Sequence, residues 1–456
     1  MRCARSRSRA GAFARAETPL PSDADLSHDP GTVADRPGGR ARDKALNYQG
    51  ANGEQAAAQN RATILNAIHR GAPISRTELA RQSRLTKQAV TRIVDRLLDE
   101  GLVMEARRRQ GLRGQPAIEL EIDPEGVFAI GANIDRDHLT IVAVDAAGNV
   151  RGRIHHEQRF FLPKDFTRLM EEAISSFLRR KIIPEPRLAG IGLAIPDWLG
   201  EVDFLERPPH YSEWSGFDVR AALSRITQHP VFIDNDANAA ALGEIEYGLG
   251  TQIDSFFYIL VNACLGGSLV INGMCHKGAG GLGGEVSWLP VVATEEGLAG
   301  ETRPIGDMYS LFHLLHHLKE NGIAVARPSD LLNLDPAGRA LVSAWLKGFA
   351  VTLAEAIIDI GMVVDPEAVL IGGRLPALLV DELLNNVRDE IGRRGMEAPS
   401  LHRTAISEDA AALGAATMPL AHRLCLPSAD ATQQTRVPMS SVMLPASLGF
   451  SAASAG

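Results

Sequence analysis

The stretch TKQAVTRIVDRLLDEG, residues 86–101, decides how the N-terminal part of the chain folds. Thr86 belongs to the residue types that cap a helix at its N-terminus, and apolar residues from Val90 to Leu98 then recur at helical spacing until Gly101. We therefore predict a helix that starts after Thr86, buries its apolar face and stops at the glycine. Its polar face should expose Thr86, Lys87, Gln88, Thr91 and Arg92.

Two further helices are expected before this stretch. Apolar residues from Ile64 to Ile68 share one face of a helix that ends before Gly71. Ser75 then caps a short helix, and Glu78 stands at the capping-box position of that helix. The helix over residues 86–101 is therefore the third of a three-helix unit.

A basic β-hairpin follows the third helix. Residues 102–106 and 118–122 predict two strands around a polar turn. Residues 58–118 hold twelve basic and five acidic side chains, although the whole chain has a net charge of -8. The arginines expected in the turn are Arg107, Arg108, Arg109 and Arg113.

Three helices and a basic hairpin together predict a winged helix-turn-helix that binds double-stranded DNA. In this interpretation the polar face of the third helix contacts bases and phosphates in the major groove. The turn arginines contact adjacent phosphates or enter the minor groove. The alternative is a helical adaptor whose charged side chains are only solvated.

Composition divides the chain into four parts. Residues 1–57 lack apolar periodicity and start with five arginines and no acid in fifteen residues, so we expect a disordered tail. A transit peptide and a nucleic-acid-binding arm are the alternatives for this tail. Residues 58–122 then form the DNA-binding domain, residues 123–424 form a larger domain, and residues 425–456 form a second disordered tail.

The overall composition is that of a soluble globular protein, with 45% hydrophobic and 22% charged residues. No uncharged apolar run is long enough for a membrane helix, and no signal-peptide core follows the first arginines. The four cysteines are too widely spaced to suggest a disulfide framework or a metal site. We therefore expect a cytoplasmic protein without a membrane partner.

Strands and helices alternate beyond residue 126. Strands are expected at Val127–Asn133 and Leu139–Asp145, a helix at Phe166–Arg180 and a buried strand at Leu188–Ile195. This alternation predicts the α/β fold class, arranged in two halves. Further elements are expected at Val231–Asp234, Ala237–Gly248, Phe256–Val261, Ser268–Ile271, Trp345–Ile360 and Ala368–Ile371.

Several motifs of the large domain resemble those of the ROK family of repressors, open reading frames and sugar kinases. The strongest is IDNDANAAALGE at residues 233–244. It is accompanied by GIGLAIP at 190–196, WSGFD at 214–218 and DPEAVLIGG at 365–373, together with the glycine-rich segment Gly278–Glu285. The resemblance implies a winged helix-turn-helix followed by a two-lobed, actin-like and sugar-kinase-like (ribonuclease H-like) ATPase fold, with a ligand cleft between the lobes.

The resemblance also implies a sugar-binding site. Asp236 matches the base of the kinase members, and Asn235 and Glu285 match residues that hydrogen-bond sugar hydroxyls. Trp288 stacks on the sugar ring or fills space. The alternative for Asp236 is a carboxylate that only faces the positive end of the helix dipole.

Two departures from the family pattern argue against catalysis and against metal binding. The kinase members have Asp-x-Gly-Gly-Thr where this chain has Asn133-Ile134-Asp135-Arg136-Asp137, so the glycines that admit phosphate are missing. Trp288 replaces the zinc-binding histidine, and Ala293–Thr302 contains no cysteine. We therefore expect no catalytic residue, with Asp236 a vestigial or candidate base, and no cofactor or metal.

These features predict a sequence-specific DNA-binding transcriptional regulator, acting as a repressor of carbohydrate metabolism genes. A degenerate sugar-kinase-like domain would sense a sugar or sugar derivative, and half-site geometry implies a homodimer or homotetramer. Two alternatives remain open. One is an ATP-dependent, glucokinase-like sugar kinase with a DNA-binding extension, and the other is a body that serves only as a dimerisation scaffold.

Overall fold

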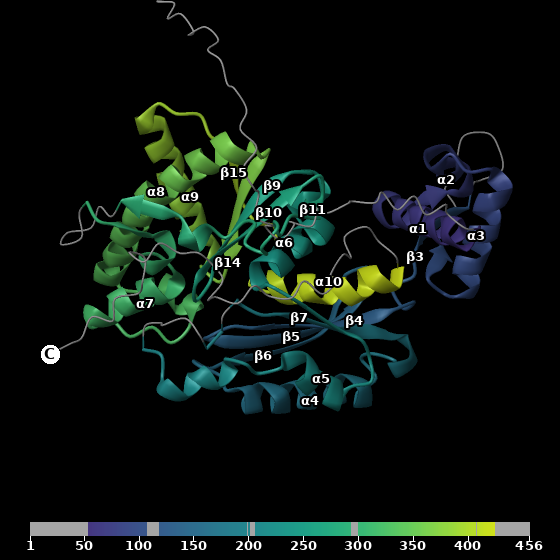
Figure 1. The fold of residues 1–456 in the computed structure, drawn as a ribbon, viewed down its shortest axis with the longest axis horizontal. Helices are drawn as coiled ribbons and strands as arrows, with labels where there is room; N and C mark the ends of the chain where they lie inside the picture. The colour runs from purple at the N-terminus through teal and green to yellow at the C-terminus, as the bar shows by residue number, and fades with distance from the viewer. Residues whose placement is uncertain are drawn as a thin grey trace, which may run out of the picture. The chain divides into compact units, whose positions relative to one another are not determined.

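The computed structural model describes residues 53–106, 118–197, 199–200, 206–292, 300–406 and 408–424 (Figure 1). The first part of the described chain is a winged helix-turn-helix. Its three strands form one sheet in the order β1-β3-β2. The elements are α1 Gly53–Gly71, β1 Ile74–Ser75, α2 Arg76–Ser83, α3 Lys87–Asp99, β2 Val103–Glu105 and β3 Glu119–Ile122.

The predicted caps start both helices of the helix-turn-helix. The Ser75 hydroxyl accepts from the Glu78 amide at 3.2 Å, and the Thr86 hydroxyl accepts from the Ala89 amide at 3.2 Å. Each cap satisfies one of the amides that a helix N-terminus leaves without an intrahelical partner. The apolar face of α3 is buried in one cluster with α1, through Val90, Val94, Leu97, Ile64, Leu65 and Ile68.

The predicted start of this domain was too late. Helix α1 begins at Gly53, so residues 53–57 belong to the first helix and not to the N-terminal tail. Alanines favour a helix without producing apolar periodicity, which is why the pattern of this segment gave no signal. The turn arginines Arg107, Arg108, Arg109 and Arg113, and residues 425–456, lie outside the described residues.

The large domain has two lobes, each built on a five-stranded sheet. The first sheet has the order β6-β5-β4-β7-β8, with antiparallel pairs among β4 to β6 and parallel pairs from β4 to β8. Helices α4 and α5 pack on one face of it through a continuous apolar cluster. The elements are β4 Phe128–Ile134, β5 His138–Asp145, β6 Val150–Glu157, α4 Pro163–Arg179, η1 Glu185–Arg187, β7 Leu188–Ala194, η2 Pro209–Trp214, α5 Val219–Ile226 and β8 Val231–Asp234.

The second sheet repeats this arrangement. Its order, β11-β10-β9-β14-β15, again places an antiparallel meander beside parallel strands. Helices α7, α8 and α9 cover one face. The elements are β9 Phe256–Val261, β10 Leu265–Ile271, β11 Met274–Cys275, α7 Leu311–Glu320, α8 Pro336–Val364, β14 Ala368–Gly373, α9 Ala377–Arg394 and β15 Ser400–Arg403. Shorter elements are η3 Leu249–Thr251, η4 Val286–Trp288, β12 Pro290–Val292, β13 Thr302–Pro304, η5 Ile305–Asp307 and η6 Pro328–Asn333.

Helices α6 (Asp236–Tyr247) and α10 (Ala410–Leu424) lie between the two sheets, as Figure 1 shows. Both are rich in alanine and glycine, so their backbones approach neighbouring elements closely. A Cβ on Gly192 of β7 would stand 1.8 Å from the Ala415 carbonyl oxygen of α10. This contact explains one glycine of the GIGLAIP motif: only glycine lets α10 rest on the sheet.

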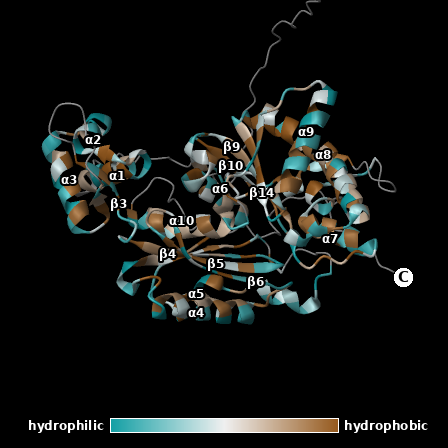
Figure 2. Ribbon diagram, turned by 180° about the vertical axis from the view of Figure 1, so that it is seen from behind, coloured by the Kyte–Doolittle hydropathy of each residue, from teal (hydrophilic) through white to brown (hydrophobic). Residues whose placement is uncertain are grey.

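The distribution of hydrophobic residues follows these layers. They concentrate on the strands and on the helix faces that meet the sheets (Figure 2). Helix α8 is long and apolar enough to cross a membrane by length and composition, but 56% of its most apolar window is buried inside the structure. Its apolar character is therefore accounted for by the core of the second lobe.

The close contact between α6 and α10 predicts that a side chain at Gly414 is destabilising. A Cβ at this position would lie 1.6 Å from the Ala239 carbonyl oxygen, so Gly414→Ala should separate the two helices and destabilise the protein by about 1–3 kcal/mol or more. Gly392 of α9 is the matched control, because a Cβ added there would have no neighbouring atom within 4 Å, and Gly392→Ala should stabilise by roughly 0.5–1 kcal/mol. Thermal unfolding compares the two variants. Equal melting temperatures would contradict the packing described here.

Candidate functional site

Helix α3 presents an exposed polar surface next to its N-terminus. Thr86, Lys87, Gln88, Thr91 and Arg92, the five residues predicted for DNA contact, are all exposed. The Thr91 hydroxyl donates to the Lys87 carbonyl of the same helix at 2.9 Å. The opposite face of α3 is buried, so the helix is fixed in place while these side chains reach solvent. This is the arrangement that a recognition helix requires.

The winged helix is joined to the large domain by polar contacts. His69 of α1 and Glu246 of α6 lie 2.9 Å apart, with side chains that are 16% and 4% exposed. Arg187, just before β7, donates to the carbonyl of Glu100 at the end of α3 at 3.2 Å. His69 belongs to α1 and Glu100 is the C-cap of α3, so the large domain contacts the winged helix at two of its helices.

The predicted sugar-binding residues meet where β8 passes into α6. Asn235 is the N-cap of α6, and its side-chain oxygen accepts from the amides of Ala237 at 2.8 Å and Asn238 at 3.2 Å. Its amide nitrogen donates to Asp197 at 2.8 Å. Asn235 is therefore held rigidly by the protein itself, and it faces Asp197, a residue that the sequence did not indicate.

Two buried carboxyls in this region, Asp236 and Glu285, have pKa values raised by burial and by neighbouring carboxylates. Burial raises the pKa of Asp236 to about 8, and the negative charges of Asp135 and Asp197 raise it further against the opposing effect of Arg136. Burial likewise raises the pKa of Glu285 to about 7, with Asp197 adding to the effect and a hydrogen bond from Ser287 opposing it. Asp236 and Glu285 are thus both influenced by Asp197, and both titrate near neutral pH and not in the ordinary carboxyl range.

Trp288 ends the short helix η4 that follows Glu285, and its side chain is half-buried. The predicted set Asn235, Asp236, Glu285 and Trp288 thus comes from the α6 N-terminus and the segment before β12.

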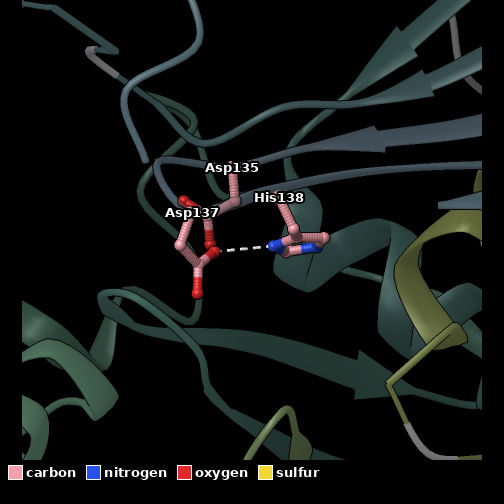
Figure 3. A group of neighbouring side chains, drawn as sticks. All are labelled: Asp135, Asp137 and His138. Carbon is pink, nitrogen blue, oxygen red and sulfur yellow. Dashed lines mark hydrogen bonds and ion pairs between the residues drawn. The ribbon is translucent and has the colours of Figure 1, made fainter. Parts of the chain in front are cut away.

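The turn between β4 and β5 holds a network of charged groups in place of a glycine loop. His138 is buried, with Nδ1 2.7 Å from Asp137 Oδ1 and Nε2 2.9 Å from Asn133 Oδ1. The Asn133 amide nitrogen donates to the Ala194 carbonyl, which leaves its oxygen facing the ring. Figure 3 shows the Asp137 carboxylate directed at the imidazole, with Asp135 beside it.

Arg374 connects this turn to the second lobe. It follows β14, and its backbone amide donates to the Asn262 side-chain oxygen at 3.0 Å. Its guanidinium donates to Asp137 at 2.6 Å and also to Glu157 at the end of β6. Burial alone would raise the pKa of Asp137, but the charges of His138 and Arg374 prevail and lower it to about 2.

These groups do not fit a metal ion or a nucleotide. Asp135, Asp137 and His138 are close enough together to share a metal, but both nitrogens of His138 and both oxygens of Asp137 already have protein partners. The negative charges of Asp135 and Asp137 would also repel a phosphate group placed beside this turn. The family zinc does not fit either, because Trp288 has no metal-binding atom and residues 293–302 contain no histidine or cysteine.

Sequence reasoning missed the residues whose role depends on distant partners. Asp197 follows the GIGLAIP motif, but only the structure brings it to Asn235. Arg374 follows the Gly372-Gly373 pair and reaches Asp137, which is 237 positions earlier in the chain. The only feature of the sequence that could have indicated Arg374 was its position directly after the DPEAVLIGG motif.

The raised pKa of Asp236 predicts a pH-dependent stability. Between the ordinary carboxyl pKa and about 8 the folded protein retains a proton that the unfolded chain releases, so stability falls as pH rises through this range. Asp236→Asn removes this loss and should raise the melting temperature over wild type by about 2–4 °C near pH 8, with a smaller difference near pH 5. The exposed Asp359→Asn variant should show no such trend. A difference that does not grow with pH would contradict the assignment.

Comparison with known proteins places these features in a family. A model of the ROK family matches residues 129–422, and a model of the MarR family matches residues 59–113. An uncharacterized protein of Sinorhizobium fredii is 27% identical over 367 residues, which cover 79% of this chain and 90% of that protein. The xylose repressor of Bacillus spizizenii is 24% identical over 375 residues, covering 80% and 96%. The N-acetylglucosamine repressor of Escherichia coli is 25% identical over 240 residues, covering 51% and 57%.

The fold has a counterpart of similar length among solved structures. A crystal structure of a ROK family transcriptional regulator, a homolog of the E. coli MLC protein, superposes with a TM-score of 0.57 at 20% identity and covers 81% of this chain and 96% of its own. This likeness concerns the fold. Because the ROK model spans well over half of the sequence, the chain belongs to the ROK family.

Proposed function

We propose that this protein is a sequence-specific, DNA-binding transcriptional repressor of carbohydrate metabolism genes, cytoplasmic, whose large domain binds a sugar effector. One observation carries the proposal: the exposed polar face of α3 belongs to a winged helix that contacts α6, the helix that starts at the candidate effector site. The relatives named xylose repressor and N-acetylglucosamine repressor support the same function.

The DNA contacts in this proposal divide by chemistry. Lys87 and Arg92 supply cations for phosphates or guanine edges, while Gln88, Thr86 and Thr91 can exchange hydrogen bonds with bases. The turn arginines Arg107, Arg108, Arg109 and Arg113 would contact phosphates or the minor groove. Because one winged helix supplies few contacts and operators have two half-sites, we propose a homodimer or homotetramer as the DNA-binding form.

Helix α6 is the proposed route from effector to DNA. A sugar that contacts Asn235 and Asp236 acts on the first turn of α6, and Glu246 in its last turn contacts His69 of the winged helix. Residues Asp236–Ile245 are all buried, so the helix transmits displacement as a rigid body. The effector releases DNA only if it binds one arrangement of the two parts more tightly than the other.

The β4–β5 turn supports a role without phosphoryl transfer. Catalysis of that reaction depends on positioning the phosphates and neutralising their charge. Here Asp135 and Asp137 are buried at the phosphate-binding position, and the nearby guanidinium of Arg374 is already engaged by Asp137 and Glu157. We infer that this turn does not bind a triphosphate.

The second candidate function is an ATP-dependent sugar kinase with a DNA-binding extension. Asp236 favours it, because a buried carboxyl whose pKa is raised to about 8 suits a general base for a sugar hydroxyl. The charges of the β4–β5 turn disfavour it.

DNA binding provides the primary test. Arg92→Ala should weaken binding to a fragment of the protein's own upstream region by about 1–3 kcal/mol, because it removes a major-groove or phosphate contact. Lys347→Ala, which removes an exposed cation of α8, is the matched control and should leave binding unchanged. Fluorescence anisotropy at fixed salt measures both. Wild-type binding that shows no preference for the upstream fragment over unrelated DNA would contradict the repressor.

A phosphorylation assay separates the two candidates. With ATP, magnesium and a panel of hexoses and pentoses, we expect no sugar phosphate above the background of a protein-free reaction. Asp236→Asn should accordingly change nothing. Sugar-dependent ATP consumption that is abolished by Asp236→Asn would instead establish the kinase.

A further inference from the structure

The two lobes of the large domain contact each other at the end of strand β6. Arg374 follows β14 in the second lobe, and its side chain is 1% exposed. Its guanidinium donates to two carboxylates of the first lobe, to Asp137 at 2.6 Å and to Glu157. His138 lies 2.7 Å from the first carboxylate, and His155 lies 3.2 Å from the second. One buried guanidinium therefore joins the lobes through two ion pairs, and each carboxylate also has a histidine partner.

A second contact between the lobes is aromatic and lies a few residues further along the chain. The Phe160 ring centroid lies 6.0 Å from that of Phe312 in α7 of the second lobe, and 5.1 Å from that of Tyr211 in its own lobe. The guanidinium of Arg159 lies over the Phe312 ring, 4.8 Å from its centroid. A cation at this distance is attracted by the face of the ring. Residues 157–160 therefore contact the second lobe at two places.

Glu206 of the first lobe adds a more exposed contact. Its carboxylate accepts from Arg159 at 2.8 Å and also from Lys319 of α7. These three side chains are between 33% and 64% exposed, so solvent weakens this contact relative to the buried ion pairs.

Two of the contact residues have strained backbones. Phe160 has a φ of 56° and Glu206 a φ of 59°, and this left-handed conformation is unfavourable for residues other than glycine. Such strain persists only where the surrounding contacts impose it, and it gathers at sites with a functional role. The contacts around both residues include those with the second lobe.

Backbone hydrogen bonds fix residues 157–160 to the β4–β5 turn of the first lobe. The Gln158 amide donates to the Asp137 carbonyl at 3.1 Å, and the Phe160 amide donates to the Arg136 carbonyl at 2.5 Å. The turn and residues 157–160 therefore form one surface, which the second lobe contacts with Arg374 and with α7. Separating the lobes would break these contacts together and leave buried carboxylates without their cation.

We propose that these contacts form a clasp that holds the two lobes closed without any ligand. Its members are Asp137, Glu157, Arg159, Phe160 and Glu206 of the first lobe, with Phe312, Lys319 and Arg374 of the second. All of the contacts are made by the chain itself, so closure requires neither a sugar nor a nucleotide. A ligand that binds between the lobes therefore meets lobes that are already closed. The inference concerns the large domain alone and does not depend on DNA binding.

Arg374→Met in the full-length protein tests the clasp. The variant removes both buried ion pairs, so the lobes should separate and the radius of gyration, measured by small-angle X-ray scattering without ligand, should increase. Hydrogen–deuterium exchange should become faster by about tenfold or more at residues 135–138 and 311–315, one segment in each lobe. Arg388→Met is the control, because Arg388 donates to Asn385 and to the Leu401 carbonyl within the second lobe. It should match the wild type in both measurements.

Phe160→Ala keeps the test decisive if Arg374→Met fails to fold, because it leaves no buried charge without a partner. It removes the ring that contacts Phe312, so it should speed exchange in the same two segments by a smaller factor. Phe217→Ala, which removes a ring that contacts Trp214 within the first lobe, is its control.

Two results would overturn the clasp. One is a radius of gyration and exchange rates in both Arg374→Met and Phe160→Ala that equal those of the wild type. The other is faster exchange at residues 135–138 alone, with an unchanged radius of gyration. In that case Arg374 would only stabilise the β4–β5 turn and would not hold the lobes closed.

Discussion

The burial of helix α6 between the two sheets is the constraint on which the rest of the structure depends. Every residue from Asp236 to Ile245 is buried, and the carboxylate of Glu244 accepts from the amides of Leu249 at 2.9 Å and Ile406 at 2.7 Å. Leu249 lies where the chain passes from α6 toward the second lobe. Ile406 lies in the segment before α10. One helix thereby connects the candidate effector site, both lobes and the winged helix.

The β4–β5 turn is held by a network of buried charged side chains that reaches from one lobe to the other. The turn is still closed by two antiparallel strands, and Asp135 accepts from the neighbouring Arg136 amide at 2.7 Å. Asp137 contacts both His138 and Arg374 in this turn. Because Arg374 comes from the other lobe, the same ion pairs hold the two lobes together.

The sequence predicted those elements whose formation is decided locally. Thr86 and Ser75 are both observed as caps, and Val231–Asp234 and Phe256–Val261 have the predicted bounds. In these segments the cap residue and the apolar pattern involve residues within one or two helical turns or within one strand. Residues that are close in the sequence are therefore enough to predict the element. The resemblance to the ROK motifs additionally predicted that the large domain has two lobes.

The rest depended on tertiary contacts. Helix α10 is rich in alanine and contains Pro419, so it shows little amphipathic pattern. Its small residues are nevertheless what allow it to lie between the sheets. Strand β6 is largely accessible and polar, so it was not recognised. The ion pairs of Arg374 and the contact between His69 and Glu246 join residues more than 170 positions apart, which no local pattern reports.

The DNA affinity of the His69→Ala variant, measured with and without the sugar that releases the wild-type protein, tests the coupling through α6 most directly. His402→Ala, which changes an exposed histidine, is the control. If α6 carries the signal, His69→Ala will bind operator DNA like wild type in the absence of sugar. In the wild type we expect the sugar to weaken DNA binding by roughly 5–150-fold, as is typical of coupled sites. In His69→Ala the sugar will change DNA binding much less or not at all. Full sugar release in His69→Ala, equal to that of wild type and His402→Ala, would contradict the coupling through α6.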